Sequence, residues 1–376
     1  MILLNKPLHT FLSENFDKET AKQLMAHDTN EQLANRICFD SREVKSGDVF
    51  VVLPSVAGNE QQYVDKAVAQ GCALIVTQKT FEHMNTPVAL VEDVMDWAGG
   101  FLKCYYRAQA ARLNVIGITG TNGKSSISFY LAQLLNELKQ NKHACAAMGT
   151  LGYGPWDNLT ATGMTTLPLE KLHGALAALS EQFDNVAIEV SSHGLEQKRL
   201  SGVDFSTAVF SNLSRDHLDY HGTMAAYGAE KAKLFHWSGL QHAVINIDDE
   251  FGKKLASECN VPVISYGRSL EAVLRFELEH VGNTGLGVSF YYQDQNVRGH
   301  VPLYGDFNAY NAAAALACAL SMGFDFEKSV AALHVLMPVE GRMMQVKVKG
   351  EVPLVLVDYA HTPDALEQVL AAVQNH

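Results

Sequence analysis

Short apolar runs alternate with helical stretches through the middle of the chain. Runs of four to eight residues of this kind are typical of buried strands, and longer periodic stretches between them are typical of helices. The runs are NVIGIT (114–119), HACAAMG (143–149), NVAIEVSS (185–192), TAVFSNLS (207–214), HAVINID (242–248) and PVISYG (262–267). This alternation predicts an α/β fold with a mostly parallel sheet, helices on both faces, and ligands at the carboxyl ends of the strands.

The pattern on either side of this region predicts further domains. Residues 1–92 are expected to form a small α/β unit with a helical start, a helix over residues 62–70 and a strand in CALIVT (72–77). The central domain is expected over residues 93–338, with a helix over 93–113 leading into it. Its last part, after Gly267, contains three stretches typical of antiparallel strands and then a helix, namely LRFELEHV, GLGVSFYYQ, VRGHVPLYG and Tyr310–Met322.

Residues 339–376 are expected to begin a third, Rossmann-like domain. They contain QVKVKG, PLVLVDYA and a helical stretch from Pro363. So few elements cannot bury both faces of a parallel sheet, so we expect this domain to be incomplete.

Composition excludes several classes of function. The chain has 376 residues, 47% of them hydrophobic, and a net charge of −12, which argues against a sequence-independent nucleic-acid surface. Its six cysteines form no C-x-x-C pair, so neither a zinc site nor a disulfide framework is predicted. Without an apolar run of about 18 residues or a signal-peptide core, we expect no membrane partner and a cytoplasmic location. We also expect a monomer.

The stretch NVIGITGTNGKSSISFY (114–130) carries the clearest chemical signal. Gly120, Thr121, Asn122 and Gly123 follow an apolar strand and precede a helix, so their backbone N–H groups and the helix N-terminus could hold an anion. Lys124 adds a mobile charge, and Ser125 offers a hydroxyl to a phosphate-bound magnesium ion. The strict G-x-x-x-x-G-K-[ST] pattern is missed by one position, because it needs a glycine at position 118, where the chain has Ile118, and the glycine is Gly117. A plain glycine-rich turn is the alternative.

Two polar stretches follow later strands. Glu189 ends the strand NVAIEV, in position to hold magnesium, although a solvated glutamate would give the same pattern. The run SNLSRDHLDYHG contains Asp216, His217, Asp219 and His221. A metal cluster and a polar loop with one functional member both fit it, and we favour the second reading with His217 as that member.

Three further groups are ambiguous from the residues alone. Lys231 and Lys233 lie on a predicted helix, where a lysine near magnesium is usually a counter-charge to phosphate. Asn308 and Asn311 lie one turn apart, so they could read a purine edge or merely cap and solvate the helix. Ser41 and Arg42 follow Asp40 in a turn between apolar segments. A functional turn and a plain turn with a solvated charge fit this pattern equally well.

Together these motifs resemble the Mur ligase family. The resemblance is carried by GTNGKSS, EVSSHGLEQKR, FSNLSRDHLDYHG, the segment Tyr227–Phe235, the pair Gly341-Arg342 and DYAHTPDAL. It is strongest to the branch that adds the third residue of the peptidoglycan stem peptide to UDP-MurNAc-L-Ala-D-Glu. It implies an ATP-dependent ligase that forms a C–N bond through an acyl-phosphate intermediate.

The resemblance also implies roles for individual residues. Gly120 to Ser126 would hold the ATP phosphates, with Ser125 and Glu189 at one magnesium ion. Lys231 would be an N6-carboxylysine, a carbamate formed from CO2, that holds a second magnesium ion with His217. The adenine, phosphate and ribose side would be formed by Asn308, Asn311, Arg342 and Asp358. The UDP-sugar-dipeptide would contact Phe39, Ser41, Arg42, Thr165, Thr166, Ser191, Gln197 and Arg199.

Alternatives remain open from the sequence. The incoming amino acid would be meso-diaminopimelate or L-lysine, and the sequence does not choose between them. A truncated, inactive chain that only binds the UDP-sugar-dipeptide and nucleotide is one alternative. A related amide ligase, such as another Mur ligase or folylpolyglutamate synthetase, is a second. A GTPase is disfavoured because the chain has no guanine-reading N-K-x-D.

Overall fold

The chain folds into two compact units of α/β structure. The computed structural model describes residues 2–25, 33–55, 57–82, 85–107, 112–282, 284–346, 355–360 and 363–375. One unit comprises residues 1–106 with 200–202, and the other comprises residues 107–199 with 203–376. The three-domain division expected from the sequence stays a prediction.

The smaller unit is built on one five-stranded sheet in the order β1-β2-β3-β4-β5, in which only β1 is antiparallel to its neighbour. Its elements are β1 (Ile2–Pro7), α1 (Leu8–Asn15), α2 (Lys18–Met25), β2 (Leu33–Cys38), β3 (Val49–Val51), α3 (Glu60–Ala69), β4 (Leu74–Thr77), β5 (Val88–Leu90) and α4 (Val94–Tyr105).

The predicted helical start is wrong for the first residues, because residues 2–7 form β1. Buried Ile2 is followed by exposed Leu3, and this period-two alternation lets one face of a strand pack while the other meets solvent. The helix expected over residues 93–113 is shorter, since α4 ends at Tyr105. Its start is fixed by Asp93, whose carboxylate accepts hydrogen bonds from the N–H groups of Met95 and Asp96 at 2.9 and 3.0 Å.

The larger unit contains a ten-stranded sheet in the order β15-β14-β13-β12-β11-β10-β6-β9-β7-β8. Its strands are β6 (Asn114–Thr119), β7 (Cys145–Gly149), β8 (Gly152–Gly154), β9 (Asn185–Glu189), β10 (Phe205–Phe210), β11 (His242–Asn246), β12 (Val263–Gly267), β13 (Leu274–Gly282), β14 (Gly285–Tyr292) and β15 (Gln295–Val301). The parallel centre and the antiparallel addition β13–β15 confirm the predicted fold class.

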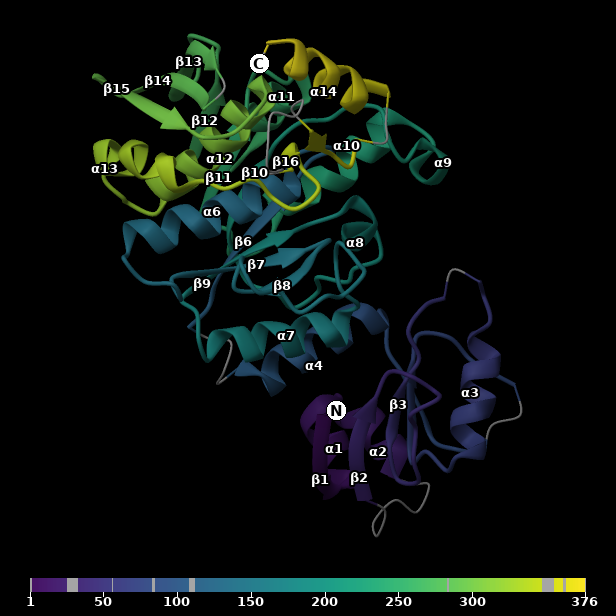
Figure 1. Cartoon of the computed structure of the whole chain (residues 1–376). Coiled ribbons are helices and arrows are strands. Elements are labelled where there is room, and N and C mark those ends of the chain that lie inside the picture. Colours follow the sequence, from purple (N-terminus) through teal and green to yellow (C-terminus); the bar gives the residue numbers. More distant parts are fainter. Residues whose placement is uncertain are drawn as a thin grey trace. The chain divides into compact units, whose positions relative to one another are not determined.

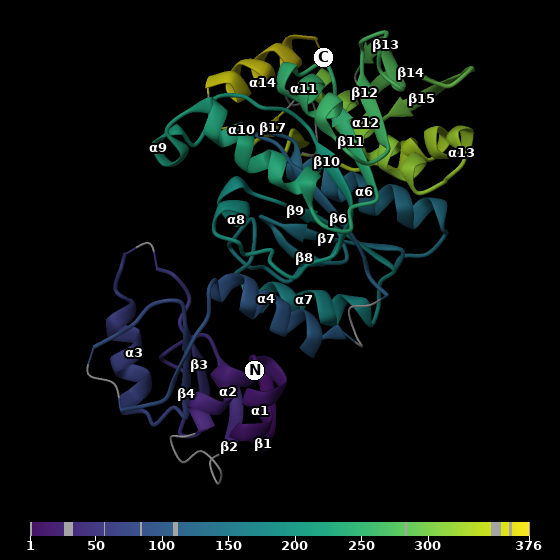
Figure 2. The same cartoon turned by 180° about the vertical axis from the view of Figure 1, so that it is seen from behind.

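Helices cover both faces of this sheet. Figures 1 and 2 show α6 and α12 side by side on one face and α7 on the other. The helical elements are α6 (Lys124–Leu138), α7 (Leu169–Ser180), α8 (Ser192–Glu196), α9 (Leu218–His221), α10 (Met224–Ala232), η1 (Lys233–His236), α11 (Glu250–Glu258), α12 (Asp306–Ser321), α13 (Phe326–Ala331) and η2 (Ala332–Val335). The run of alanines in α12 is fully buried, because small side chains let this helix lie close to α6 and the sheet.

The last part of the chain contains β16 (Met344–Gln345) and β17 (Leu356–Val357), paired antiparallel, and α14 (Pro363–Asn375). The predicted helix from Pro363 is thus present. The predicted strands QVKVKG and PLVLVDYA lie partly outside the described residues.

Two properties of the whole chain follow from these elements. All six cysteines are free thiols, and Cys104 is exposed. Among the helices of the described residues, none combines the length and apolar character needed to cross a bilayer.

Truncating a core leucine tests this packing. Leu316 on α12 is fully buried, whereas Leu270 is 87% exposed. We expect Leu316→Ala to lower the free energy of unfolding by about 2–5 kcal/mol, since it removes packed atoms and leaves a cavity. Leu270→Ala should change it by less than about 0.5 kcal/mol. Denaturant titration of both variants measures this, and equal losses would contradict the described core.

Candidate functional site

The loop between β6 and α6 lies at the centre of the larger sheet's carboxyl edge, because β6 is flanked by β10 and β9. Gly120 and Gly123 have φ of +147° and +87°, a region that glycine adopts without strain. A Cβ atom would also lie 1.9 Å from the Ser211 hydroxyl oxygen at position 120 and 2.5 Å from the Asn311 amide oxygen at position 123. Both glycines are therefore required by local geometry.

The loop is held in shape by the end of β10. The Thr121 N–H donates to the backbone carbonyl of Asn212 at 2.8 Å, and the Asn122 N–H donates to the Asn212 side-chain oxygen at 2.9 Å. Two of the expected anion donors are thus occupied. The N–H groups in the first turn of α6 have no helical acceptor, so the N-terminus of this helix remains available to an anion.

Two lysines converge on one carbonyl oxygen of this loop. The Lys124 ammonium donates to the carbonyls of Gly120 and Thr121 at 2.9 and 2.8 Å, and Lys231 donates to the Gly120 carbonyl at 2.8 Å. Lys231 is 1% exposed, with its nitrogen 4.3 Å from the centre of the Tyr227 ring. Among the described residues, no carboxylate forms an ion pair with either lysine. Two buried lysine side chains therefore lie together here, and among the described residues neither is in direct contact with a carboxylate.

Burial lowers the pKa of both lysines. Burial lowers the pKa of Lys231 well below its ordinary value, and the charge of Lys124 lowers it further, while Asp216 opposes the shift. Burial also lowers the pKa of Lys124, with Glu189 opposing. A neutral Lys231 amine is a nucleophile, which an ammonium ion is not.

Glu189 ends β9 beside the loop and is 1% exposed. Its two carboxylate oxygens accept hydrogen bonds from the N–H and the hydroxyl of Thr150, each at 3.0 Å. Thr150 follows β7, so two adjacent strand ends meet here. A Cβ atom on Gly149 would lie 2.0 Å from the Glu189 oxygen, so the missing side chain makes room for the carboxylate.

His217 lies in the segment between β10 and α10. Its backbone is left-handed, with φ of +52°, and its N–H donates to the Asp216 carboxylate at 2.8 Å. Burial lowers the pKa of His217, with Asp216 opposing and the charges of Lys124 and Lys231 lowering it further. A neutral imidazole is the form that binds metal. Within the described ranges no three His, Cys, Asp or Glu side chains group together as a metal site.

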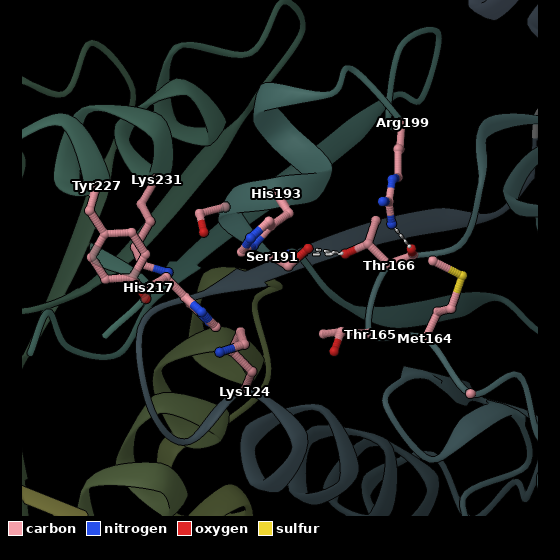
Figure 3. A pocket seen from close by; sticks show the side chains of 12 residues that line it. Lys124, Met164, Thr165, Thr166, Ser191, His193, Arg199, His217, Tyr227 and Lys231 are labelled. Carbon is pink, nitrogen blue, oxygen red and sulfur yellow. Dashed lines mark hydrogen bonds between the residues drawn. The ribbon is translucent and has the colours of Figure 1, made fainter. Parts of the chain in front are cut away.

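Two cavities meet at this point. One, of about 310 Å³, is lined by Lys124, Thr165, Thr166, Ser191, His193, Arg199, His217, Tyr227 and Lys231, with neighbouring residues. Figure 3 shows these side chains around it. The other, of about 300 Å³, is lined by residues 121–126 of the loop and α6 and by Thr150, Thr165, Glu189, Asp216, His217, Asn311, Arg342 and Asp358, among others. Both cavities share Lys124, Thr165 and His217, so groups bound in the two would meet there.

Hydrogen bonds fix the walls of the first cavity. The Thr166 hydroxyl lies 2.9 Å from the Ser191 hydroxyl, and the Thr166 carbonyl accepts a hydrogen bond from Arg199 at 3.0 Å (Figure 3). Arg199 also donates to the Gln197 side-chain oxygen at 2.9 Å. The predicted contacts Thr165, Thr166, Ser191, Gln197 and Arg199 thus lie together in the structure.

The two asparagines of α12 differ in position. Asn311 lines the second cavity, whereas Asn308 lies behind it and lines neither. The Asn308 oxygen accepts hydrogen bonds from Tyr130 at 3.1 Å and from the Asn311 amide at 3.0 Å, and the Asn308 amide donates to the Tyr304 carbonyl at 2.7 Å. Asn308 therefore orients Asn311.

Arg342 and Asp358 line the same cavity as Asn311. The Arg342 guanidinium carbon lies 4.8 Å from the Tyr359 ring centre, and the Asp358 carboxylate accepts from the N–H groups of Met343 and Ala360 at 2.8 and 2.7 Å.

The remaining predicted contacts belong to the smaller unit, which is described by itself. Ser41 is buried, Phe39 is half-buried, and the Arg42 side chain is 77% exposed and bonded to Asp40. Arg42 donates through Nε and Nη2 at 2.9 and 2.6 Å, so its own neighbour neutralises it in this structure.

Several residues of the site were not singled out from the sequence. They are Thr150, Asn212 and Tyr227, together with His193, whose ring centre lies 4.9 Å from that of His217. Thr150 and Asn212 each follow an apolar strand, and the strand-end rule that selected Glu189 would have selected them too.

Comparison with known proteins agrees with this geometry. Residues 118–319 match the Mur ligase middle domain. The chain is 40% identical, over 346 residues, to UDP-N-acetylmuramoyl-L-alanyl-D-glutamate–2,6-diaminopimelate ligase of Neisseria meningitidis serogroup B, covering 89% of this chain and 70% of that protein. It is 37% identical to the Pseudomonas aeruginosa ligase of the same name, covering 94% and 73%.

The chain belongs to the Mur ligase family. A solved structure of a ligase with the same name superimposes with a TM-score of 0.78 at 35% identity, covering 90% of this chain and 70% of that one. The predicted family and the predicted class, an ATP-dependent ligase that forms a C–N bond, are confirmed.

The lowered pKa of Lys231 predicts how stability depends on pH. Between that lowered pKa and the ordinary value of 10.5, the native protein binds fewer protons than the unfolded chain, so raising the pH stabilises it. We expect Lys231→Met to remove this contribution, reducing the gain in unfolding free energy from pH 7 to pH 9 by up to about 1.4 kcal/mol per pH unit.

Denaturant unfolding at both pH values, in CO2-depleted buffer, measures this effect. The control is Lys233→Met, because the Lys233 side chain is 52% exposed. Parallel pH profiles for wild type and Lys231→Met would show that Lys231 is protonated normally.

Proposed function

We propose that this chain joins an amino acid to the D-glutamyl carboxylate of UDP-N-acetylmuramoyl-L-alanyl-D-glutamate at the expense of ATP. The observation that carries the proposal is the pair of cavities that share Lys124, Thr165 and His217. An acyl-phosphate intermediate requires a phosphoryl donor and a carboxylate acceptor to meet, and the shared wall is where occupants of the two cavities would do so.

The second cavity suits ATP. The free N–H groups at the start of α6 and the Lys124 ammonium would hold phosphates, with Gly120 to Ser126 forming the cradle. On the remaining walls Asn311, Arg342 and Asp358 offer an amide, a cation and a carboxylate for the nucleoside end. Asn308 would act by orienting Asn311.

The donor set also fits magnesium. Mg²⁺ is typically held by one or two carboxylates together with substrate phosphates and waters, so a large acidic cluster is not required. Ser125 and Glu189 line the phosphate cavity, with a hydroxyl and a buried carboxylate. They would hold one ion, which supplies positive charge to the transferring phosphoryl group.

Lys231 is proposed to carry a carbamate. Its lowered pKa favours the neutral amine, whose nitrogen attacks the carbon of CO2 and loses a proton, leaving an N6-carboxylysine anion. This change converts an amine beside the Gly120 carbonyl into a negatively charged oxygen ligand. Lys231 and His217 would then hold a second magnesium ion.

The first cavity suits the sugar-peptide part of the substrate. The Arg199 guanidinium lines it and, within the described structure, has no carboxylate partner, so it can bind a substrate carboxylate. Thr165, Thr166, Ser191 and Gln197 add polar contacts. In the smaller unit, Phe39, Ser41 and Arg42 are proposed to contact the uridine end.

The chemistry that these residues support is charge neutralisation and positioning. A carboxylate is a poor electrophile, and transfer of the ATP γ-phosphoryl group to it brings two anions together. Lys124, at the shared wall, offsets this repulsion as the new P–O bond forms and the bond to ADP breaks. The amine then attacks the acyl carbon, and inorganic phosphate leaves.

We propose 2,6-diaminopimelate as the amino acid, because the relatives at 37–40% identity are named for it. L-Lysine is the alternative. A monomeric state and a cytoplasmic location stay predictions, and the free thiols are consistent with a reducing compartment.

Phosphate release tests the function. With ATP, Mg²⁺ and UDP-N-acetylmuramoyl-L-alanyl-D-glutamate, we expect turnover only when diaminopimelate is added, because the acyl phosphate needs an amine to complete the reaction. L-Lysine and D-alanyl-D-alanine are the comparison amines. Turnover with a folate substrate instead, and no binding of the UDP-linked one by calorimetry, would contradict the proposal.

Substitution of Lys231 tests the carbamate. We expect Lys231→Ala to lose at least about 100-fold in kcat, in keeping with the effect of removing a transition-state electrostatic contact. Bicarbonate should not restore it, since alanine cannot be carboxylated. Lys233→Ala is the control, because Lys233 pairs with Glu230 at 2.6 Å and lines neither cavity. If the wild-type kcat is the same in CO2-depleted buffer as in buffer with bicarbonate, Lys231 does not carry a carbamate.

A further inference from the structure

A chain of hydrogen bonds leads from the segment that carries His217 to the floor of the first cavity. The Tyr220 hydroxyl, on α9, lies 2.6 Å from the Glu196 carboxylate and 3.1 Å from the Gln197 amide nitrogen. The Gln197 oxygen accepts from Arg199 at 2.9 Å through Nε and 2.5 Å through Nη2. Arg199 continues the chain to the Thr166 carbonyl.

The direction of every hydrogen bond in this chain is fixed by chemistry. A guanidinium has donors only, so Gln197 must turn its oxygen toward Arg199. Its amide nitrogen then faces Tyr220, whose hydroxyl oxygen must accept. The Tyr220 proton is left to point at Glu196, which as a carboxylate can only accept. One orientation of Gln197 therefore satisfies all four side chains. Arg199 sets that orientation, and the Tyr220 hydroxyl, whose own proton goes to Glu196, holds the other end of the Gln197 amide by accepting from it.

The ring of Tyr220 is also held in place. Its centre lies 4.1 Å from that of His193 and 4.9 Å from that of His221. The His221 ring nitrogen in turn lies 2.9 Å from the Ser192 hydroxyl on α8. Tyr220 lines neither cavity, whereas Arg199 lines the first. It can therefore affect a bound substrate through Gln197 and Arg199, but not by contact.

We propose that Tyr220 is a positioning residue that orients Gln197 and Arg199 for the anionic sugar-peptide substrate. The proposal rests on the function proposed above. Tyr220 and His217 lie in the same short segment. Tyr220 therefore also links the wall of the first cavity to the segment that carries His217, which lines both cavities.

The test is a double-mutant cycle in the full-length protein. Tyr220→Phe keeps the ring and removes the hydroxyl, and Gln197→Ala removes the link to Arg199. We expect Tyr220→Phe to raise KM for the UDP-linked substrate roughly 5-fold, as expected for one lost hydrogen bond, and to leave KM for ATP unchanged. In the Gln197→Ala background Tyr220→Phe should add nothing further, because its effect passes through Gln197.

Tyr291→Phe is the matched control. Its hydroxyl donates to Glu277 at 2.9 Å on the surface of the antiparallel strands, so it removes the same kind of bond away from both cavities. It should leave both KM values unchanged.

The outcomes separate this inference from the proposed function. If wild type turns over while Tyr220→Phe leaves KM for the UDP-linked substrate unchanged, or if the effects of Tyr220→Phe and Gln197→Ala multiply independently, Tyr220 has no positioning role. If calorimetry shows that wild type does not bind the UDP-linked substrate, the proposed function fails, and this inference fails with it.

Discussion

Two buried lysine side chains that donate to one carbonyl oxygen define this site. Lys124 and Lys231 both donate to Gly120, and within the described structure neither has a carboxylate partner. Burying charge without a partner is costly, and protein interiors relieve the cost by deprotonation, by pairing or by binding an anion. The triphosphate and the Lys231 carbamate proposed above would each add negative charge next to these two lysines.

The parallel sheet makes this convergence possible. The loop after β6, Glu189 after β9 and Thr150 after β7 come from separate stretches of sequence, yet parallel strands deliver all of them to one edge. The helix α10 brings Lys231 to the same edge, where α8 and α9 also pack beside it (Figure 2). Rigid elements thus hold groups that repel one another, which flexible loops would let separate.

The parts of this arrangement that depend on local sequence could be predicted. Apolar periodicity predicted the strands, and the glycines, Lys124 and Ser125 predicted a phosphate loop within one short stretch. Residues whose importance comes from tertiary contacts could not be found in this way. Asn308 and Asn311 look equivalent in the sequence, but only the packing of Tyr130 against α12 shows that one orients the other. Gly149 carries no chemistry at all and matters because Glu189 occupies its space. The strand β1 was missed because the helix that follows dominates the local pattern.

The hydrogen bonds from the loop at residues 120–123 to Asn212 have a consequence for when this loop can form during folding. Thr121 and Asn122 take their shape from a residue about ninety positions later in the chain, after β10 has paired with β6. Residues 114–138 thus contain the whole strand-loop-helix motif in sequence, but the loop depends on a later residue for its conformation. During synthesis, the loop therefore cannot take its final shape until the chain has been made through Asn212, so any ligand that needs this shape can bind only after that long-range contact has formed.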